Sequence, residues 1–305
     1  MSATQQALAV GRAAATPRLR RRAWHGGLQG SEYAWAIAFA LPYIAIFLAF
    51  VVYPIGYGVW MGSDPALYTD LFSDPRYLTS VANTLLYVGI GVNVKMFLAF
   101  MLSGFFIRKR WWIKALLVIF ILPWATPALP AYMSIHWFLN GQWGMLNNVL
   151  YLLTGVDGPV YLNDRWMGLA CNIGAYIWKT LPFWTIILLA GRMAVPQELY
   201  EAAAVDGANG LRKFAHVTLP LMANLYLVCV LLDMVFALGD FNATYFVSGG
   251  GPAMSTEVLA TLGIRYAFTI AQPRLGVAAV MSALPLLIPL VILLMRKLRM
   301  SEGQL

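Results

Sequence analysis

Six long apolar stretches dominate this chain and restrict what it can fold into. The hydrocarbon core of a bilayer is about 30 Å thick, so a helix that crosses it needs about 20 apolar residues. Only 11% of the 305 residues are charged, against roughly a quarter in ordinary soluble domains. We therefore predict an all-α integral membrane protein with six transmembrane helices. Their approximate ranges are Tyr33–Trp60, Val81–Ile107, Ile113–Leu139, Met167–Gly191, Leu221–Val247 and Leu275–Met295.

The positively charged residues alternate between loops, and this pattern predicts the topology. Fifteen of the 21 lysines and arginines lie before the first stretch, around the turn between the second and third (including Lys114 at the start of the third), between the fourth and fifth, or after the sixth. The other three loops together contain four arginines. Because cytoplasmic loops carry the excess of Lys and Arg, we expect both termini and residues 196–220 to be cytoplasmic. This placement explains the net charge of +8 without a nucleic-acid partner.

The composition divides the chain into a basic N-terminal arm (residues 1–30), a six-helix domain (residues 31–300) and a tail (residues 301–305). The arm lacks periodicity and is expected to lie near anionic lipid. A full-length span follows it without a small-residue cleavage pattern, so we expect the first helix to be retained. Cys171 and Cys229 lie inside predicted spans and the three histidines lack metal-ligand spacing, so we expect neither a disulfide nor a metal site.

The third stretch contains Pro123, Pro127 and Pro130, each of which lacks a backbone donor and disrupts a regular helix. Such a break is tolerated in a membrane only where protein or water satisfies the freed carbonyl groups. A structural kink and a flexible gate beside a pathway both fit this pattern. Beyond it, "MLNNVLYLL" is typical of a short amphipathic helix at the outer surface.

Residues 196–220 are small, alanine-rich and charged, unlike the apolar runs on either side. Pro196 suits a helix start, and Gly207 can end that helix with positive φ. Asn209 is a good N-cap for a second short helix that is expected to stop before Pro220. The segment is either a docking site for another protein or an ordinary connector at the membrane surface.

This segment also resembles a known motif, the EAA loop of the membrane subunits of ATP-binding-cassette (ABC) importers. The matching residues are Glu201, Ala202, Ala203, Gly207, Val217, Thr218, Leu219 and Pro220. The family more often has isoleucine in the place of Val217. Other stretches resemble the carbohydrate branch of these importers, the maltose and glycerol-3-phosphate type: "LPYIAIFLAFVVYPIGYGVWM", "DPRYLTSVANTLLYV", "ILPWATPALP" and "FNATYFVSGGGPAMSTEVLATLGIRYAF". The loop between Trp60 and Tyr77 is shorter than is usual there.

The resemblance implies a type I ABC importer permease in a bacterial inner membrane, with a sugar or sugar derivative as cargo. It implies three kinds of partner: a second, homologous permease, two copies of a cytoplasmic ATPase, and an external solute-binding protein. In the family the EAA helix sits in a cleft of the ATPase, which assigns the contact to Glu201, Ala202, Ala203, Asp206 and Gly207. No Gly-Lys-Ser/Thr P-loop occurs in the chain, so we expect no enzymatic activity or cofactor here, and ATP and Mg on the ATPase subunit.

Charged residues inside predicted spans are costly and usually face a bundle interior or a watery cavity. Lys95, Lys179, Asp233 and Asp240 are such residues. Lys95 either forms a buried pair or lines the pathway. Lys179 either neutralises an anionic group on the cargo or pairs with one of the two aspartates. Helical spacing and polar character suggest this pathway set: Tyr176, Lys179, Thr180, Phe183, Asp233, Asp240 and Asn242.

Two other classes of membrane protein compete with the importer hypothesis. A secondary transporter driven by an ion gradient also needs charges inside the membrane, but it normally shows inverted repeats and more spans. An intramembrane enzyme needs a catalytic constellation on facing spans, and the sequence does not indicate one. Copurification with an ATPase would distinguish the importer from both.

Overall fold

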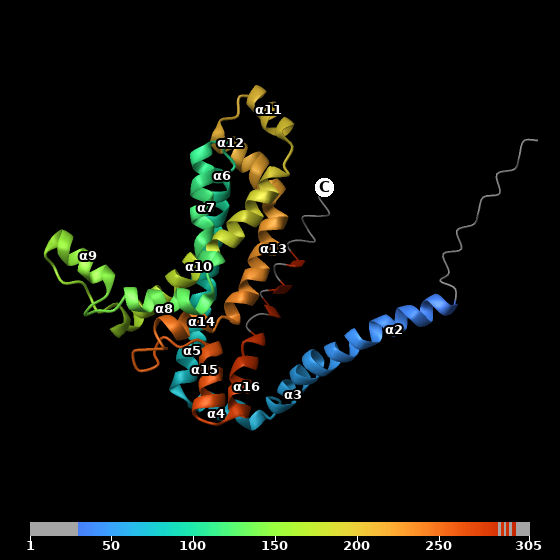
Figure 1. The fold of residues 1–305 in the computed structure, drawn as a ribbon, viewed down its shortest axis with the longest axis vertical. Helices are drawn as coiled ribbons and strands as arrows, with labels where there is room; N and C mark the ends of the chain where they lie inside the picture. Colours follow the sequence, from blue (N-terminus) through green and yellow to red (C-terminus); the bar gives the residue numbers. More distant parts are fainter. Residues whose placement is uncertain (1–29, 286–287, 290, 293–294, 297–305) are drawn as a thin grey trace, which may run out of the picture. The chain divides into compact units, whose positions relative to one another are not determined.

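The computed structural model describes residues 30–285, 288–289, 291–292 and 295–296, and every regular element in these residues is helical (Figure 1). Most of the predicted N-terminal arm and the whole C-terminal tail lie outside them. In chain order the helices are α2 (Gly30–Phe47), η1 (Leu48–Val52), α3 (Tyr53–Met61), α4 (Pro65–Ser73), α5 (Pro75–Leu86), η2 (Tyr87–Val92), α6 (Asn93–Phe106), α7 (Trp111–Ala125), α8 (Ala128–Phe138), α9 (Met145–Thr154), η3 (Tyr161–Asn163), α10 (Arg165–Met193), α11 (Gln197–Val205), α12 (Gly210–Lys213), η4 (Phe214–Thr218), α13 (Leu219–Leu238), α14 (Asn242–Val247), α15 (Leu259–Ile264), η5 (Arg265–Thr269) and α16 (Pro273–Met281).

Four of the described helices are long and apolar enough to cross a membrane, and the bent pair α7–α8 would be a fifth. The four are Tyr33–Met61, Pro75–Phe106, Arg165–Met193 and Gly210–Leu238. The sixth predicted stretch begins as α16, which ends at Met281 and is followed by a turn. Several residues of that stretch beyond Ala283 lie outside the described part of the chain.

Contacts divide the chain into two units, Met1–Ile55 and Gly56–Leu305. In the first, α2 and η1 carry large exposed apolar side chains such as Phe39 and Phe50, as suits a surface in lipid. The π-helical η1 ends two residues before Pro54, and the Tyr53 N–H bonds five residues back to Leu48. The wider turn accommodates a proline that cannot donate to the usual helical acceptor.

Two Asp-Pro pairs start the next helices. Asp64 and Asp74 each accept a hydrogen bond from the backbone two residues on, at 3.0 and 2.9 Å, and the proline that follows each is the first helical residue. An aspartate N-cap with proline at the first position is a strong start signal. The second span therefore begins at Pro75, six residues before the predicted start at Val81.

The third apolar stretch breaks as its prolines predict. Helices α7 and α8 meet at an angle of 97°. Thr126 and Pro127 form the junction and have extended backbone, with ψ of 147° and 143°. Because Pro127 has no N–H, the carbonyl group four residues earlier loses its helical donor.

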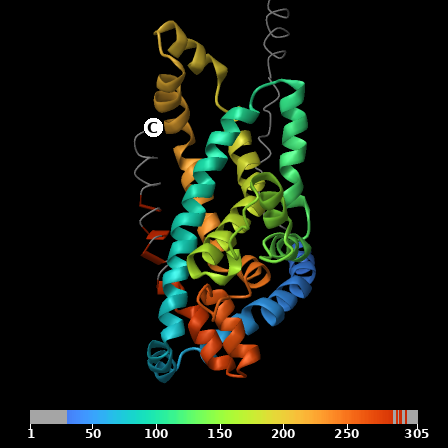
Figure 2. The same cartoon turned by 90° about the vertical axis from the view of Figure 1, so that its left-hand side faces the viewer.

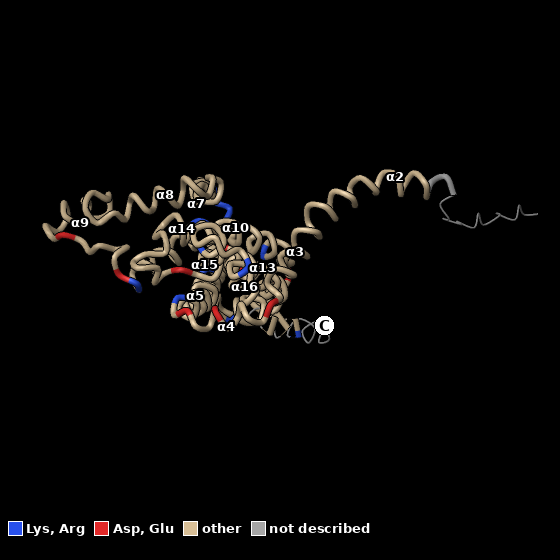
Figure 3. The backbone as a smooth tube through the Cα atoms, turned by 90° about the horizontal axis from the view of Figure 1, so that it is seen from below, with Lys and Arg blue, Asp and Glu red and all other residues tan. Residues whose placement is uncertain are grey.

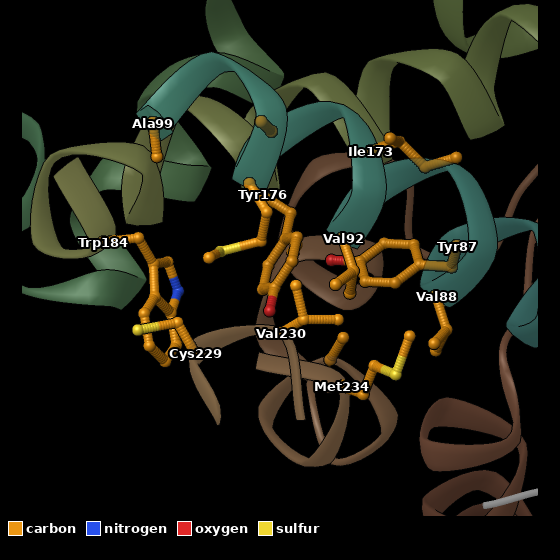
Figure 4. Close-up of a cluster of buried hydrophobic side chains, with 14 of the residues drawn as sticks. Tyr87, Val88, Val92, Ala99, Ile173, Tyr176, Trp184, Cys229, Val230 and Met234 are labelled. Carbon is orange, nitrogen blue, oxygen red and sulfur yellow. The ribbon is translucent and has the colours of Figure 1, made fainter. Parts of the chain in front are cut away.

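The long helix α10 is the centre of the main core, which α6, α8, α13 and α14 complete. Figure 4 shows its side chains Tyr176 and Trp184 beside Val230 and Cys229 of α13. Lipid tails are as apolar as leucine, so helices in a membrane gain little from apolar burial alone and depend on close packing and polar contacts. Polar contacts inside this core are therefore expected to contribute to the association of its helices.

A smaller core joins α4, the start of α5, and the hairpin of α15 and α16. In this hairpin a side chain on Gly276 would meet the Gly263 carbonyl oxygen at 2.5 Å, so the two backbones approach closely, as small residues allow. Tyr266 donates to Asp74 at 2.5 Å. Burial alone would raise the pKa of Asp74, but hydrogen bonds from Tyr266 and Arg76 bring it below its ordinary value.

The fifth span differs from its prediction at both ends. It starts at Gly210 rather than Leu221 and ends at Leu238 rather than Val247. Asp240 follows the end of α13, and its carboxylate accepts at 3.3 Å from the Ala243 N–H in the first turn of the separate helix α14. Aspartate competes for local backbone donors in this way and favours helix starts over helix interiors.

Within the second unit, the α6–α7 turn and the segment of α11 and α12 lie at one end, and α4 lies at the other (Figures 1 and 2). Charged residues are sparse along the described chain (Figure 3). The basic turn between α6 and α7 therefore shares an end of the bundle with residues 196–220, as the charge pattern predicts.

Candidate functional site

A salt bridge between Lys95 and Asp233 lies inside the helix bundle. Lys95 comes from α6 and Asp233 from α13, and Lys95 Nζ lies 2.8 Å from Asp233 Oδ1. The two side chains are 0% and 1% exposed. An unpaired charge at such a place would cost several kcal/mol, so each residue requires the other. The prediction that Lys95 forms a buried pair is confirmed.

Helix α10 adds two hydroxyl groups to this pair. Tyr176 donates to Asp233 Oδ1 at 3.0 Å, and Lys95 Nζ donates to Thr180 Oγ1 at 2.8 Å. The ammonium also lies 3.6 Å from the centroid of the Tyr176 ring, within reach of a cation–π interaction. We call Lys95, Asp233, Tyr176 and Thr180 the buried polar cluster. It links three membrane-spanning helices through one network.

Lys179 does not pair with an aspartate, so the pairing with Asp233 or Asp240 that the sequence suggests is wrong. Its ammonium donates instead to the carbonyl oxygens of Pro123, Trp124 and Thr126, at 2.8, 3.1 and 2.7 Å. These carbonyls lie at the end of α7, where the proline break removes their helical donors. A cation at a helix C-terminus also complements the helix dipole. Lys179 thus supplies hydrogen bonds to the carbonyl groups that the bend between α7 and α8 leaves without helical donors.

The residues of the predicted α10 face make two separate sets of contacts. Successive residues on a helix are about 100° apart, so Lys179 and Thr180 lie at opposite edges of the face centred on Tyr176. One edge meets the buried polar cluster and the other meets α7. Phe183 also faces α7, where its ring stacks on Trp124 with centroids 5.5 Å apart. The structure therefore brings Tyr176, Thr180 and Asp233 together but separates them from Lys179.

Asp240 belongs to a second polar contact. Its Oδ2 accepts from the Tyr87 hydroxyl at 2.6 Å. Tyr87 was not among the predicted site residues, because a tyrosine inside an apolar run more often packs or anchors a helix at the interface. Asn242, the first residue of α14, is exposed.

An apolar cavity of about 710 Å³ lies between α8 and α10, next to the bend. Its walls include Pro127, Pro130, Ala175 and Trp178. The bend in the third span thus borders open space on one side, and Lys179 of α10 bonds to its carbonyl groups.

Residues 196–220, which we call the coupling segment, begin with α11. This helix ends in a Schellman motif: the Gly207 N–H donates to Ala204 O at 3.1 Å, and the Ala208 N–H donates to Ala203 O at 2.8 Å. Gly207 has φ +74°, a left-handed conformation in which a side chain is strained. The prediction that this glycine ends the helix is confirmed.

The second half of the coupling segment starts at Asn209, whose Oδ1 accepts from the Arg212 N–H at 2.9 Å, as the N-cap prediction requires. The predicted stop before Pro220 is wrong. The chain continues through the π-helical η4 into α13, and the Leu219 N–H bonds five residues back to Phe214. The π turn lets Pro220 sit in the first turn of α13, where its missing donor is not needed.

The coupling segment turns its predicted contact residues outward. Glu201, Ala202, Asp206 and Gly207 are exposed and Ala203 is half-buried. Two apolar side chains beside them, Val205 and Leu211, are 87% and 81% exposed. A 3.0 Å hydrogen bond between the hydroxyl groups of Tyr200 and Thr218 tethers α11 to the bundle. The surface is exposed and open to a partner.

Comparisons with known proteins show several transport permeases. The sulfoquinovosyl glycerol transport system permease protein SmoG of Agrobacterium fabrum is 35% identical over 196 residues, which cover 63% of this chain and 62% of that protein. The trehalose/maltose permease protein MalF of Thermococcus litoralis is 28% identical, with coverage of 74% and 81%. The sn-glycerol-3-phosphate permease protein UgpA of Yersinia pseudotuberculosis is 31% identical, with coverage of 72% and 79%.

The fold is shared with a solved bacterial ABC transporter that imports the acidic polysaccharide alginate. The TM-score is 0.73 at 23% identity, and the alignment covers 88% of this chain and 96% of the other. Residues 95–299, two thirds of the sequence, match the family described as the binding-protein-dependent transport system inner membrane component. The matched region contains the buried polar cluster, the bend and the coupling segment, and the chain belongs to this family of multi-pass inner-membrane permeases.

Proposed function

We propose that this chain is a permease subunit of an ATP-driven, binding-protein-dependent importer, and that its cargo is a sugar or sugar derivative. The family match and three relatives whose names give sulfoquinovosyl glycerol, trehalose or maltose, and sn-glycerol-3-phosphate support this proposal. The chain forms half of a pathway that a second, homologous permease completes. The ion-gradient alternative does not account for an exposed coupling segment.

The observation that carries the proposal is the outward-facing coupling segment. Glu201 and Asp206 present charge, while Ala202 and Ala203 keep the backbone accessible. A capped helix that is tethered to the start of α13 can transmit a push from a partner into a membrane-spanning helix. We assign the ATPase contact to these four residues and to Gly207, which permits the turn.

The proposed coupling role implies partner subunits that carry out the other steps of transport. Two ATPase copies would bind ATP and Mg, since the sequence contains no P-loop, and the permease itself would catalyse no reaction. An external solute-binding protein would deliver the cargo, and a solved complex of the alginate transporter with an alginate pentasaccharide-bound periplasmic protein supports this role. We propose six spans with both termini cytoplasmic. The common end of the basic α6–α7 turn and the coupling segment supports this topology.

For the pathway we propose different roles within the predicted set. Asn242 is exposed, and Asp240 and Phe183 are partly exposed, so these three can meet cargo. Lys95, Tyr176, Thr180 and Asp233 contact one another and hold together the helices that line the path. Lys179 holds the bend.

Copurification tests the proposed function. A tagged chain expressed with its partner subunits should retain an ATPase, and reconstituted complex should take up sugar only with ATP and a loaded binding protein. Uptake driven by an ion gradient without ATP would refute the proposal.

A further inference from the structure

A second pocket, of about 830 Å³, lies where the α6–α7 turn meets the junction of α10 and α11. It is separate from the buried polar cluster and from the cavity beside the bend. Its walls come from the α6–α7 turn, the first turns of α7, the end of α10 and the coupling segment.

The pocket concentrates positive charge. Arg108, Lys109, Lys114 and Arg192 are all among its lining residues, and none of the described residues that line it is acidic. Helix α7 starts here without an acidic residue in its first turn, so the positive end of its dipole adds to this charge. Four like charges around one pocket repel one another. An anion in the pocket would offset that repulsion.

Arg192 is held in place from behind. Its Nη2 donates to the Phe100 carbonyl oxygen at 3.1 Å, and its guanidinium lies 5.0 Å from the Phe100 ring centroid. A side chain on Gly104 would meet Nη1 at 2.8 Å. Gly104 therefore leaves the space that this guanidinium occupies. A fixed arginine recognises an anion with less loss of side-chain entropy than a free one.

Much of the remaining wall is apolar. Ile107, Leu117 and Met193 line the pocket beside the basic groups, and the neighbouring Trp111 is 81% exposed, as is typical of an interfacial anchor. A free inorganic anion would use only the basic half of such a pocket. A lipid with a phosphate headgroup and acyl chains would use both halves.

We propose that this pocket binds the headgroup of an anionic phospholipid, with the phosphate among the four basic side chains and an acyl chain along the apolar wall. Basic pockets between membrane helices are known to hold such headgroups. Gln197, Tyr200 and Thr218 of the coupling segment line the same pocket. The bound lipid would therefore lie at the base of the coupling segment.

Native mass spectrometry of the purified transporter tests this proposal without ATP, so its result is independent of the proposed function. The complex is exchanged into mixed micelles with phosphatidylglycerol or phosphatidylcholine, and retained lipid is counted. Lys109→Gln/Lys114→Gln removes two exposed charges from the pocket. Arg110→Gln/Arg212→Gln, the matched control, removes two from the same end of the bundle but outside the pocket.

We expect the unaltered chain to retain phosphatidylglycerol in preference to phosphatidylcholine. The pocket variant should lose about tenfold or more in retention, because two of the four basic side chains are neutralised, and the control variant should match the unaltered chain. Unchanged elution in size-exclusion chromatography checks that both variants fold. Equal loss in the control, equal retention of the two lipids, displacement by inorganic phosphate, or exclusion of lipid by the assembled ATPase would each overturn the proposal.

Discussion

The buried polar cluster and the coupling segment both place charged residues in a chain that is otherwise apolar, but they treat those charges in opposite ways. In the cluster, Lys95 and Asp233 are almost fully buried and form an ion pair with each other. In the coupling segment, Glu201 and Asp206 are exposed, and Glu201 accepts a hydrogen bond from the neutral side chain of Gln197 at 3.1 Å. Charge that is paired within the chain holds the bundle together, whereas charge left outside is available to another protein.

We expect the largest effect from a substitution that breaks the ion pair in the buried polar cluster. Lys95→Met leaves Asp233 buried without its cation, so we expect a loss of about 3–5 kcal/mol in the free energy of unfolding. Thermal unfolding of the purified complex in detergent would measure it as a lower Tm.

The double variant Lys95→Met/Asp233→Leu is the control for that prediction. Replacing both partners by apolar residues removes the unpaired charge, and such replacements are often close to neutral. We expect most of the lost stability to return. A double variant as unstable as Lys95→Met would mean that the pair is not the source of the effect.

Lys179→Met should cost less, because it leaves carbonyl groups rather than a charge unsatisfied. An unsatisfied buried polar group costs about 1–3 kcal/mol, and freed carbonyls at the bend can be rescued in part by water. We expect uptake of neutral and anionic sugars to fall equally, because Lys179 holds the bend. Selective loss of anionic cargo would instead assign it to charge recognition.

Gly207→Ala tests the exposed coupling segment at the turn that ends α11. Its left-handed backbone costs a side chain about 1 kcal/mol, which should loosen the end of α11. We expect faster hydrogen exchange in residues 203–208 and weaker ATPase stimulation, with little change in Tm. Gly210→Ala is the matched control, since a side chain there would meet open space without positive φ. Equal effects of the two variants would contradict a specific role for the turn.

The smallest effect concerns pH at the far end of the bundle. The pKa of Asp74 is lowered in the folded chain by Tyr266 and Arg76 against the effect of burial. Its contribution to stability is therefore present above the unfolded pKa of about 3.9 and is lost as pH falls through the lower folded pKa. Asp74→Asn should remove this acid-dependent part of Tm, and Asp70→Asn, at an exposed position of α4, should not.

The coupling segment was predictable in detail because its signals are local. Gly207 ends α11 through contacts within five residues, and Asn209 caps the next helix through a residue three positions on. The proline break at Pro127 is local too. What failed here was the stop before Pro220, because a π turn can absorb a proline and the sequence does not mark such turns.

The partners inside the bundle were not predictable in the same way. Lys95 and Asp233 are separated by 138 positions, and helical spacing gives a face without saying which helix it meets. The sequence suggested Asp233 or Asp240 as a partner for Lys179. Instead, Lys179 donates to backbone carbonyl groups that only the bend between α7 and α8 exposes. A pairing between spans depends on how the helices pack, which periodicity leaves open.

The most direct test of the outward-facing coupling segment is retention of the ATPase by the purified, tagged chain. Glu201→Lys reverses the charge of a proposed contact residue, and Glu198→Lys makes the same change one turn earlier, outside the motif. We predict that Glu201→Lys releases the ATPase while the Tm of the permease stays the same, and that Glu198→Lys keeps it. Undiminished ATPase retention and sugar uptake with Glu201→Lys would contradict the proposed coupling role.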